Sequence, residues 1–222
     1  MIRLHHVPQS RSERVLWLLG EIDAACGLAY EVVVHPFDRS LRAPDYLALS
    51  PAGRVPALEM DGRAHFESGA LVQILCERFP EAGLGRAPGH PERADWLVWL
   101  HFAETITQEA VTLTMQHVTL RDPATRSPVL MRLAATRLER CFAAVEDALG
   151  GAFLLPEGFS AADIAVGQAV HGASRFADPA PFPRLADWLA RLRARPAFAA
   201  AQPAPGQAVI YDRAFYPAPE PA

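Results

Sequence analysis

Two short strands, enclosed between a proline turn and the start of a helix, restrict the fold of this chain more than any other feature. The run Ala57–Met60 is joined to Ala64–Phe66 by Asp61-Gly62, a strong hairpin signal. Val55-Pro56 precedes the first strand, and we expect this peptide bond to be cis, because only an X-Pro bond makes the cis form accessible. Such a turn leaves the N–H and C=O of Val55 free to pair with another extended peptide.

An acid and a serine, Glu67-Ser68, follow the second strand directly and open a helix. The carboxylate of Glu67 suits an amine, and the hydroxyl of Ser68 with the free helix N–H groups suits a carboxylate. Taken alone, the pair is equally well explained as a helix cap. Eleven residues after Val55-Pro56, it predicts instead a site for an extended peptide with a free amine and a free carboxylate at one end.

Periodicity divides the chain into a mixed half and a helical half. Apolar patterns predict strands over 2–7, 29–35, 57–60 and 64–66, alternating with helices over 14–23, 45–49 and 69–79. This β-α-β-α-β-β-α order is that of a thioredoxin-like domain. The segment Pro80–Glu92 is rich in proline and glycine and predicts a linker. Later residues predict only helices, over 93–120, 129–149, 160–176 and 185–193. We therefore expect an α/β domain at about 1–80 and an all-α domain at about 91–210.

Composition excludes several classes of partner. The net charge of −4 provides no basic field for nucleic acid. No run approaches the ~18 apolar residues that a membrane helix needs, and residues 1–6 do not have the pattern of a signal peptide. Cys26, Cys76 and Cys141 are widely spaced, which is typical of reduced thiols. We expect a cytoplasmic protein that binds neither nucleic acid nor a membrane.

The histidines give no metal pattern. His5 and His6 are adjacent on a predicted strand and point to opposite faces, so they cannot chelate one ion together. His101 and His117 have no acid or cysteine at ligand spacing. We expect no metal.

The segment Ser10-Arg11-Ser12-Glu13-Arg14-Val15-Leu16-Trp17-Leu18-Leu19 lies between the first strand and the first helix. It resembles a run found in many bacterial and fungal glutathione transferases. The stretch from Trp96 to Glu104 is similar to the first long helix of the bacterial relatives, although Thr105-Ile106 replaces their usual Gly-Ser step. Ser160-Ala161-Ala162-Asp163 resembles a capping box in the helical domain of that superfamily, and we expect it to be structural. The chain thus resembles a serine-type, bacterial member of the glutathione S-transferase superfamily.

The resemblance implies roles for particular residues. Glutathione, an extended peptide with a free amine and carboxylate at its head, would pair with Val55 at the Val55-Pro56 turn, while Glu67 meets its amine and Ser68 its γ-glutamyl carboxylate. Arg54 would meet the glycine carboxylate, or would be a solvated loop charge. Ser10, four residues before Arg14, would donate to the thiol. Ser12 is the competing hydroxyl, and Ser10-x-x-Glu13 also fits a capping box that needs no ligand.

The function implied is transfer of reduced glutathione to a small hydrophobic electrophile held between the two domains of a homodimeric protein. Glutathione is the co-substrate in this interpretation. Peroxide reduction, dehalogenation and a non-catalytic binding role on the same fold are the alternatives. Isomerisation ranks last, because the Ser-Ser-Cys-x-x-x-Arg run of the isomerase branch is absent. The identity of the electrophile is not readable from the sequence.

Overall fold

A computed structural model describes residues 1–220, and its elements follow the predicted order. The strands are β1 (Ile2–His6), β2 (Tyr30–Val34), β3 (Ala57–Met60) and β4 (Arg63–Phe66). The α-helices are α1 (Ser12–Cys26), α2 (Pro44–Leu47), α3 (Ser68–Arg78), α4 (Arg93–Thr114), α5 (Pro128–Ala148), α6 (Ala161–Ala173), α7 (Pro183–Arg193) and α8 (Pro196–Ala200). Short 3₁₀ turns lie at Arg39–Arg42, Pro80–Ala82 and Pro123–Thr125, and a π-helical turn at Met115–Thr119.

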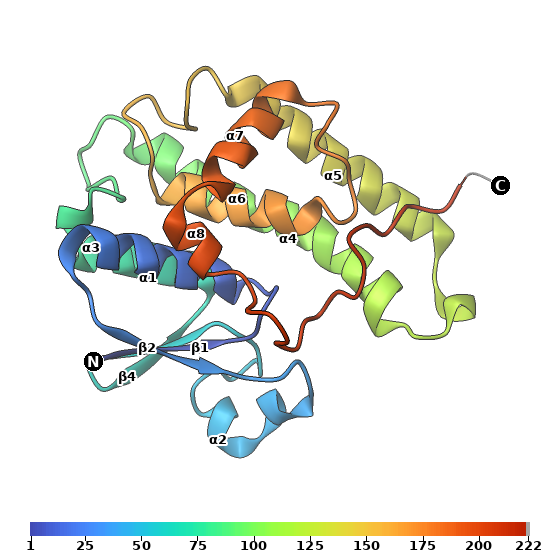
Figure 1. The fold of residues 1–222 in the computed structure, drawn as a ribbon, viewed down its shortest axis with the longest axis horizontal. Coiled ribbons are helices and arrows are strands. Elements are labelled where there is room, and N and C mark those ends of the chain that lie inside the picture. The colour runs from blue at the N-terminus through green and yellow to red at the C-terminus, as the bar shows by residue number, and fades with distance from the viewer. Residues whose placement is uncertain (221–222) are drawn as a thin grey trace.

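The four strands form one mixed sheet in the order β2-β1-β3-β4. β1 is parallel to β2 and antiparallel to β3, with Leu4 opposite Leu58. Both leucines are fully buried, because α1 and α3 cover that face of the sheet while α2 lies on the opposite side (Figure 1). This is a thioredoxin-like arrangement, as predicted.

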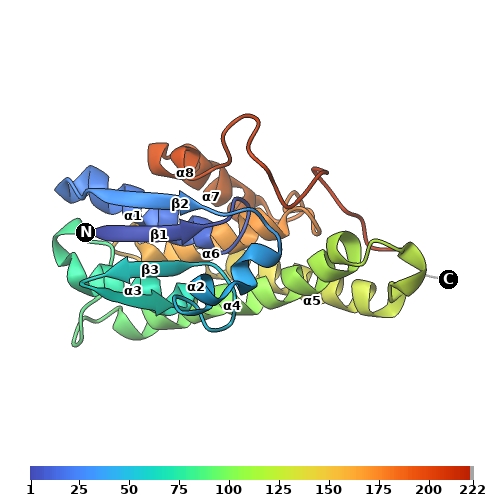
Figure 2. The ribbon, with the colours of Figure 1, turned by 90° about the horizontal axis from the view of Figure 1, so that it is seen from below.

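The remaining helices form a second layer on the far side of α1 and α3 (Figures 1 and 2). The capping box predicted at the start of α6 is present: Ser160 Oγ accepts from the Ala162 N–H at 3.2 Å, and Asp163 accepts from the Ser160 N–H at 3.0 Å. Asp163 also accepts from Trp188 Nε1 at 3.0 Å, which ties α6 to α7. The structural role expected for this box is confirmed. None of the helices within residues 1–220 has the length and apolar character to cross a membrane.

The two layers meet across α1. Gly167 of α6 packs so closely against α7 that an added Cβ would lie 2.4 Å from Leu192 Cδ1, and 3.5 Å from the ring of Trp17 in α1. Trp17 also meets Phe198 of α8 edge-on, with ring centroids 5.0 Å apart. α1 therefore belongs to the core of both halves.

The bounds of several elements differ from the sequence prediction, and one helix is additional. α1 begins at Ser12 rather than Arg14, so Ser10 lies one residue before the N-cap, Arg11. The helix expected over 93–120 ends at Thr114 and gives way to the π-helical turn, which no local pattern indicates. α8 was not predicted, because its five residues carry too little periodicity. Residues 217–220 are in neither a helix nor a strand.

Candidate functional site

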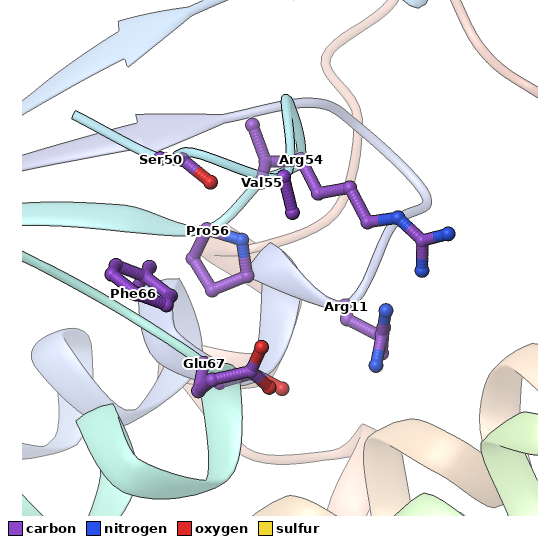
Figure 3. Close-up of a pocket in the computed structure, with 9 residues that line it drawn as sticks. Arg11, Ser50, Arg54, Val55, Pro56, Phe66 and Glu67 are labelled. Atoms are coloured by element: carbon purple, nitrogen blue, oxygen red, sulfur yellow. The ribbon is translucent and has the colours of Figure 1, made fainter. Parts of the chain in front are cut away.

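Two adjoining pockets open between the sheet and the helical layer. The first, of about 370 Å³, is lined by Arg11, Ser50, Ala52, Arg54, Val55, Pro56, Phe66, Glu67 and Ser68 (Figure 3). The second, of about 380 Å³, lies between the loop after β1, residues 37–42, the second half of α4, the C-terminal half of α6 and the C-terminal segment. Arg11, Arg54 and Val55 line both pockets, so the two form one continuous site.

The Val55-Pro56 bond is cis, as predicted, and it leads directly into β3 at Ala57. Val55 is half-buried at the boundary of the two pockets. Within residues 1–220, neither its N–H nor its C=O has a hydrogen-bond partner. The turn itself is fixed from behind, since the Tyr46 hydroxyl donates to the Arg54 carbonyl at 3.0 Å. An unpaired backbone edge therefore faces the first pocket.

Glu67 and Ser68 lie at the junction of β4 and α3. Glu67 is exposed and has φ = 73°, a left-handed value that is uncommon for a residue with a side chain. Figure 3 shows its carboxylate extending into the pocket, on the same side as Arg11. Ser68 is buried as the first residue of α3, where N–H groups lack intrahelical partners. The Glu67 carboxylate, a hydrogen-bond acceptor, thus lies beside the N–H groups at the start of α3, which can bind an anion.

A buried ion-pair cluster forms the floor beneath this junction. The guanidinium of Arg14, which has no solvent exposure, pairs with Glu104 of α4 and donates to Thr107 Oγ1 at 3.1 Å. Arg11 donates to the other oxygen of Glu104 at 2.9 Å. Ser68 Oγ lies 3.4 Å from both Arg14 Nη1 and Glu104 Oε1. Burial raises the pKa of Glu104, but the charges of Arg14 and Arg11 outweigh this and hold it below its usual value. Two cations therefore share one carboxylate, which leaves the floor positive.

The two serine candidates occupy different environments. Ser10 is half-buried and lines the second pocket, while Ser12 has no solvent exposure. Ser12 Oγ lies 2.8 Å from His6 Nδ1 and 2.7 Å from Ser10 Oγ, and it accepts from the Val7 N–H at 3.1 Å. Burial lowers the pKa of His6 to about 4, so this imidazole is neutral. Of the two serines only Ser10 lines the site, and Ser12 is buried in contact with its hydroxyl.

The capping box that was the alternative interpretation of Ser10 and Glu13 does not form with the pairing that this motif requires. Ser10 Oγ accepts from the Ser12 N–H at 3.2 Å, and the carboxylate of Glu13 accepts from the Gln9 N–H at 2.7 Å. The reason is the left-handed conformation of Gln9 (φ = 61°), which turns its N–H toward the helix. The Gln9 side chain in turn accepts from the Tyr211 N–H at 2.8 Å. Glu13 thus fixes the loop that carries Ser10 and, through Gln9, the C-terminal segment.

The second pocket has two unlike walls. On one wall, the β1–α1 loop contributes Arg11, the 3₁₀ turn before α2 contributes Arg42, and the turn between α2 and β3 contributes Arg54. The opposite wall comes from α4, its π-helical turn, α6 and the C-terminal segment, and consists of uncharged side chains, most of them small, apolar or hydroxyl-bearing: Thr107, Ala110, Val111, Thr114, Met115, Thr119, Gln168, Ala169, Gly172, Ala173, Ile210 and Tyr211. The Tyr211 hydroxyl lies 2.9 Å from Thr114 Oγ1, which anchors the segment across α4.

The predicted residues Ser10, Arg54, Val55, Pro56, Glu67 and Ser68 all line this continuous site. Sequence reasoning assigned no role there to Arg11, Glu104 or Tyr211. Arg11 lies within the Ser10–Leu19 run, so that motif could have indicated it, and Glu104 closes the stretch that begins at Trp96. Nothing local marks Tyr211, which reaches the pocket through long-range packing.

One group of potential metal ligands lies outside the site. His90, Glu92 and Glu157 bring their ligand atoms within 4.8 Å of one another. Both oxygens of Glu92 are already engaged, one with Arg86 Nε at 2.8 Å and the other with the Glu157 N–H at 2.9 Å. This arrangement is explained as an ion-pair cluster at the end of the linker.

Comparison with known proteins gives matches in both halves. The family profile described as "Glutathione S-transferase, N-terminal domain" matches residues 4–83, and "Glutathione S-transferase, C-terminal domain" matches residues 116–191. Glutathione S-transferase 1 of Saccharomyces cerevisiae is 25% identical over 224 residues, covering 91% of this chain and 94% of that protein. Glutathione S-transferase 3 of Schizosaccharomyces pombe is 32% identical over 104 residues, 47% of this chain and 41% of that protein. The chain therefore spans about two fifths of the length of that second relative.

Another relative and two solved structures add detail. Maleylacetoacetate isomerase of Rhizobium meliloti is 40% identical over 67 residues, 30% of each chain. A sphingomonad glutathione S-transferase complexed with glutathione is 26% identical, with a TM-score of 0.74 over 90% of this chain and 96% of that one. A glutathione transferase of Methylococcus capsulatus is 28% identical, with a TM-score of 0.74 over 90% and 97%.

The buried carboxyl of Glu13 predicts a pH-dependent stability. Burial raises its pKa from 4.5 to about 7, against the opposing effects of the Gln9 N–H, Arg175 and Gln168. Because the folded protein holds this proton more tightly than the unfolded chain, the stabilisation is complete below pH ~4.5 and is lost as the pH rises through ~7. Urea unfolding of a Glu13→Gln variant should show a weaker decline between these pH values than the parent. The exposed Glu139→Gln variant is the control, and equal declines in all three proteins would contradict this role of Glu13.

Proposed function

This chain belongs to the glutathione S-transferase superfamily, and on that premise we propose that it is a glutathione transferase that joins the thiol of reduced glutathione to a small electrophile. The observation that carries the proposal is the coincidence, in one continuous site, of an unpaired backbone edge, a carboxylate, a helix N-terminus and an accessible hydroxyl. A solved relative complexed with glutathione supports the choice of ligand.

Each part of glutathione has a complement in the first pocket. The cysteinyl backbone would pair with the free N–H and C=O of Val55 as an added strand. The γ-glutamyl amine would meet the carboxylate of Glu67, and the neighbouring carboxylate would meet Ser68 with the first N–H groups of α3. Arg54, at the boundary of the two pockets, would meet the glycine carboxylate. The positive floor beneath Ser68 further favours a ligand whose groups are mostly anionic.

Ser10 is the proposed thiol-activating residue. An extended ligand paired with Val55 would bring its sulfur to the boundary of the pockets, toward Ser10. A free thiol has a pKa of ~8.5, and lowering it by ~2 units requires only about 2.7 kcal/mol. A hydroxyl donor, the start of α1 and the excess cation shared by Arg11 and Arg14 all stabilise the thiolate. Ser12, lying behind Ser10, would orient its hydroxyl through the contact between the two oxygens.

The transfer reaction needs no catalytic group other than the Ser10 hydroxyl, the start of α1 and the positive charge of Arg11 and Arg14. The thiol loses its proton to solvent, and the thiolate sulfur forms a bond to the electrophilic carbon. The bond from that carbon to its leaving group breaks, and the leaving group departs with the electron pair; for an activated double bond, a solvent proton completes the addition instead. Proximity of the two reactants between the layers supplies much of the acceleration. The second pocket, of about 380 Å³, is the proposed electrophile site.

Glutathione-dependent isomerisation is the second candidate, favoured by the match to a maleylacetoacetate isomerase. The same bound thiolate could add to an activated double bond and leave again after rotation about the resulting single bond. The Ser10-Arg11-Ser12 sequence lacks the cysteine of the isomerase branch. Transfer therefore stays the primary proposal, and turnover with a panel of electrophiles and cis-alkenes would separate the two.

We expect Glu67→Gln to weaken glutathione binding without loss of fold. The substitution removes the charge that would meet the ligand's amine, and a hydrogen bond to a charged group is worth ~1.5–3 kcal/mol. The parent should gain ~2.7 kcal/mol of stability at a hundred times the Kd. Titration calorimetry with reduced glutathione measures the binding, and thermal unfolding with and without glutathione measures the gain in stability. The exposed Glu81→Gln variant is the control. A parent that gives no heat and no thermal shift in millimolar glutathione would contradict the site as well as the function.

We expect Ser10→Ala to raise the pKa of the bound thiol and to cut turnover at neutral pH by ~10²-fold, the usual effect of losing a donor to a developing anion. Ser12→Ala should disturb the thiol less, since its hydroxyl has no access to the ligand, but should lower stability because its contacts are buried. Thiolate absorbance of bound glutathione against pH, in both folded variants, is the decisive measurement. A raised pKa in the Ser12 variant alone would reverse the assignment.

The proposed assembly is a homodimer. Three apolar side chains stand exposed within one and a half turns at the start of α5, Val129, Leu130 and Leu133, and exposed apolar side chains gathered in this way mark association surfaces. Light scattering should therefore give about twice the monomer mass. A value of 24.2 kDa at micromolar concentration would reject the dimer.

A further inference from the structure

The charge distribution of the second pocket is unlike that of the whole chain. Three arginines and no aspartate or glutamate line this pocket, although the chain has 25 acidic residues and a net charge of −4. The arginines Arg11, Arg42 and Arg54 all come from the sheet-bearing half, and the opposite wall is uncharged. The pocket proposed for the electrophile is therefore positive along one side and largely apolar along the other.

Only one of these three cations remains without an assigned partner. Arg11 is engaged by Glu104 at 2.9 Å. Arg54 lines both pockets, which suits it to the glycine carboxylate of glutathione, whereas Arg42 lines the second pocket alone. Within the described chain, no side chain accepts a hydrogen bond from the guanidinium of Arg42 or forms an ion pair with it. Its charge is thus available to a ligand of the second pocket.

The backbone beneath Arg42 is held in place from two directions. The Asp38 carboxylate accepts from the Ser40 N–H at 2.8 Å and begins the 3₁₀ turn that ends at Arg42. Gly53 has φ = 61°, and an added Cβ would lie 2.9 Å from the Leu41 carbonyl and 3.6 Å from Arg42 Cγ. Leu41 itself is buried beside Val7. The stem of Arg42 therefore starts from a fixed position at the rim of the pocket.

We propose, building on the transferase function above, that the preferred electrophile is an amphipathic carboxylate. Its carboxylate pairs with Arg42, and its apolar body lies against Ala110, Val111, Met115 and Ile210 on the opposite wall. A guanidinium matches a carboxylate with two parallel hydrogen bonds. One unassigned cation suits a monoanion better than a doubly charged phosphate ester, which would need a second.

Arg42 also bears on the reaction itself. A thiolate and an anionic electrophile repel each other, so in water the approach of the two is slower than that of a thiolate and a neutral molecule. In the site, Arg42 offsets the charge of the electrophile while the sulfur lies at Ser10. The pocket thus lowers the electrostatic barrier for the anionic substrate and gives no comparable advantage to a neutral one.

A matched pair of aryl chlorides tests this preference. 1-Chloro-2,4-dinitrobenzene is neutral and 4-chloro-3,5-dinitrobenzoate carries a carboxylate. With both, the thiolate sulfur bonds to the ring carbon that bears chlorine, chloride leaves with the bonding electrons, and the thiol proton passes to the buffer. The measurement is kcat/KM for each reagent, divided by its uncatalysed rate constant, in the parent, Arg42→Met and Arg39→Met. Arg39 lies in the same turn as Arg42 but lines neither pocket, and is the matched control.

The benzoate-to-neutral ratio should fall about tenfold in Arg42→Met, as expected for one hydrogen-bonded charge pair at a partly solvated rim, and should stay unchanged in Arg39→Met. In the parent, raising the ionic strength from ~0.05 to ~0.5 M should lower the ratio, because salt screens exposed charges. A ratio unaffected by Arg42→Met would overturn the proposal while leaving the transferase function intact. Equal losses in both variants would also overturn it, since they would indicate a diffuse field.

If neither reagent is turned over, the proposed transferase function is contradicted. The preference of the second pocket for a carboxylate is then tested by equilibrium binding. The two glutathione conjugates, S-(2,4-dinitrophenyl)glutathione and S-(4-carboxy-2,6-dinitrophenyl)glutathione, are titrated calorimetrically into the parent and Arg42→Met. Tighter binding of the carboxylated conjugate to the parent, with that advantage lost in the variant, supports the proposal. Equal affinities of the parent for both conjugates overturn it.

Discussion

The buried guanidinium of Arg14 is the constraint on which the rest of the structure depends. A charge with no solvent exposure is tolerated only when its donors are satisfied, and its partners come from separate elements: Ser68 of α3, Glu104 and Thr107 of α4, and Gln168 of α6. Loss of a partner from a buried ion pair generally costs several kcal/mol. Correct pairing of Arg14 therefore requires that the sheet-bearing half and the helical half adopt one relative position, which is also the position that forms the pockets.

The same cluster sets the electrostatics above it. Because Arg11 and Arg14 share one carboxylate, the cluster has an excess of positive charge directly below the start of α3 and beside the Ser10 loop. The rest of the chain is net negative. A stabilising interaction between the two halves and an attractive field for an anionic ligand thus arise from the same three side chains.

The features that could be predicted from the sequence are those that depend on residues close together in the chain. The Val55-Pro56 turn, the hairpin that follows it and the Glu67-Ser68 helix start each depend on a few neighbouring residues, and all three are present. The fold class followed from periodicity. The features that were missed depend on contacts across the chain: Arg11 meets a glutamate 93 positions away, and the pairing of Glu13 depends on the left-handed conformation of Gln9, a residue that gives no turn signal. Local patterns do not encode such contacts.

The connection between Gln9 and Tyr211 has a consequence for biosynthesis. Tyr211 is held by a residue near the first strand and by Thr114 of α4, and it forms part of the wall of the second pocket. The Val55 turn and the start of α3 are synthesised early in translation, whereas the part of this wall that Ile210 and Tyr211 contribute is synthesised much later. The nascent protein therefore passes through a stage in which one half of its site exists without the other, and a truncation before Tyr211 would leave the second pocket open on that side.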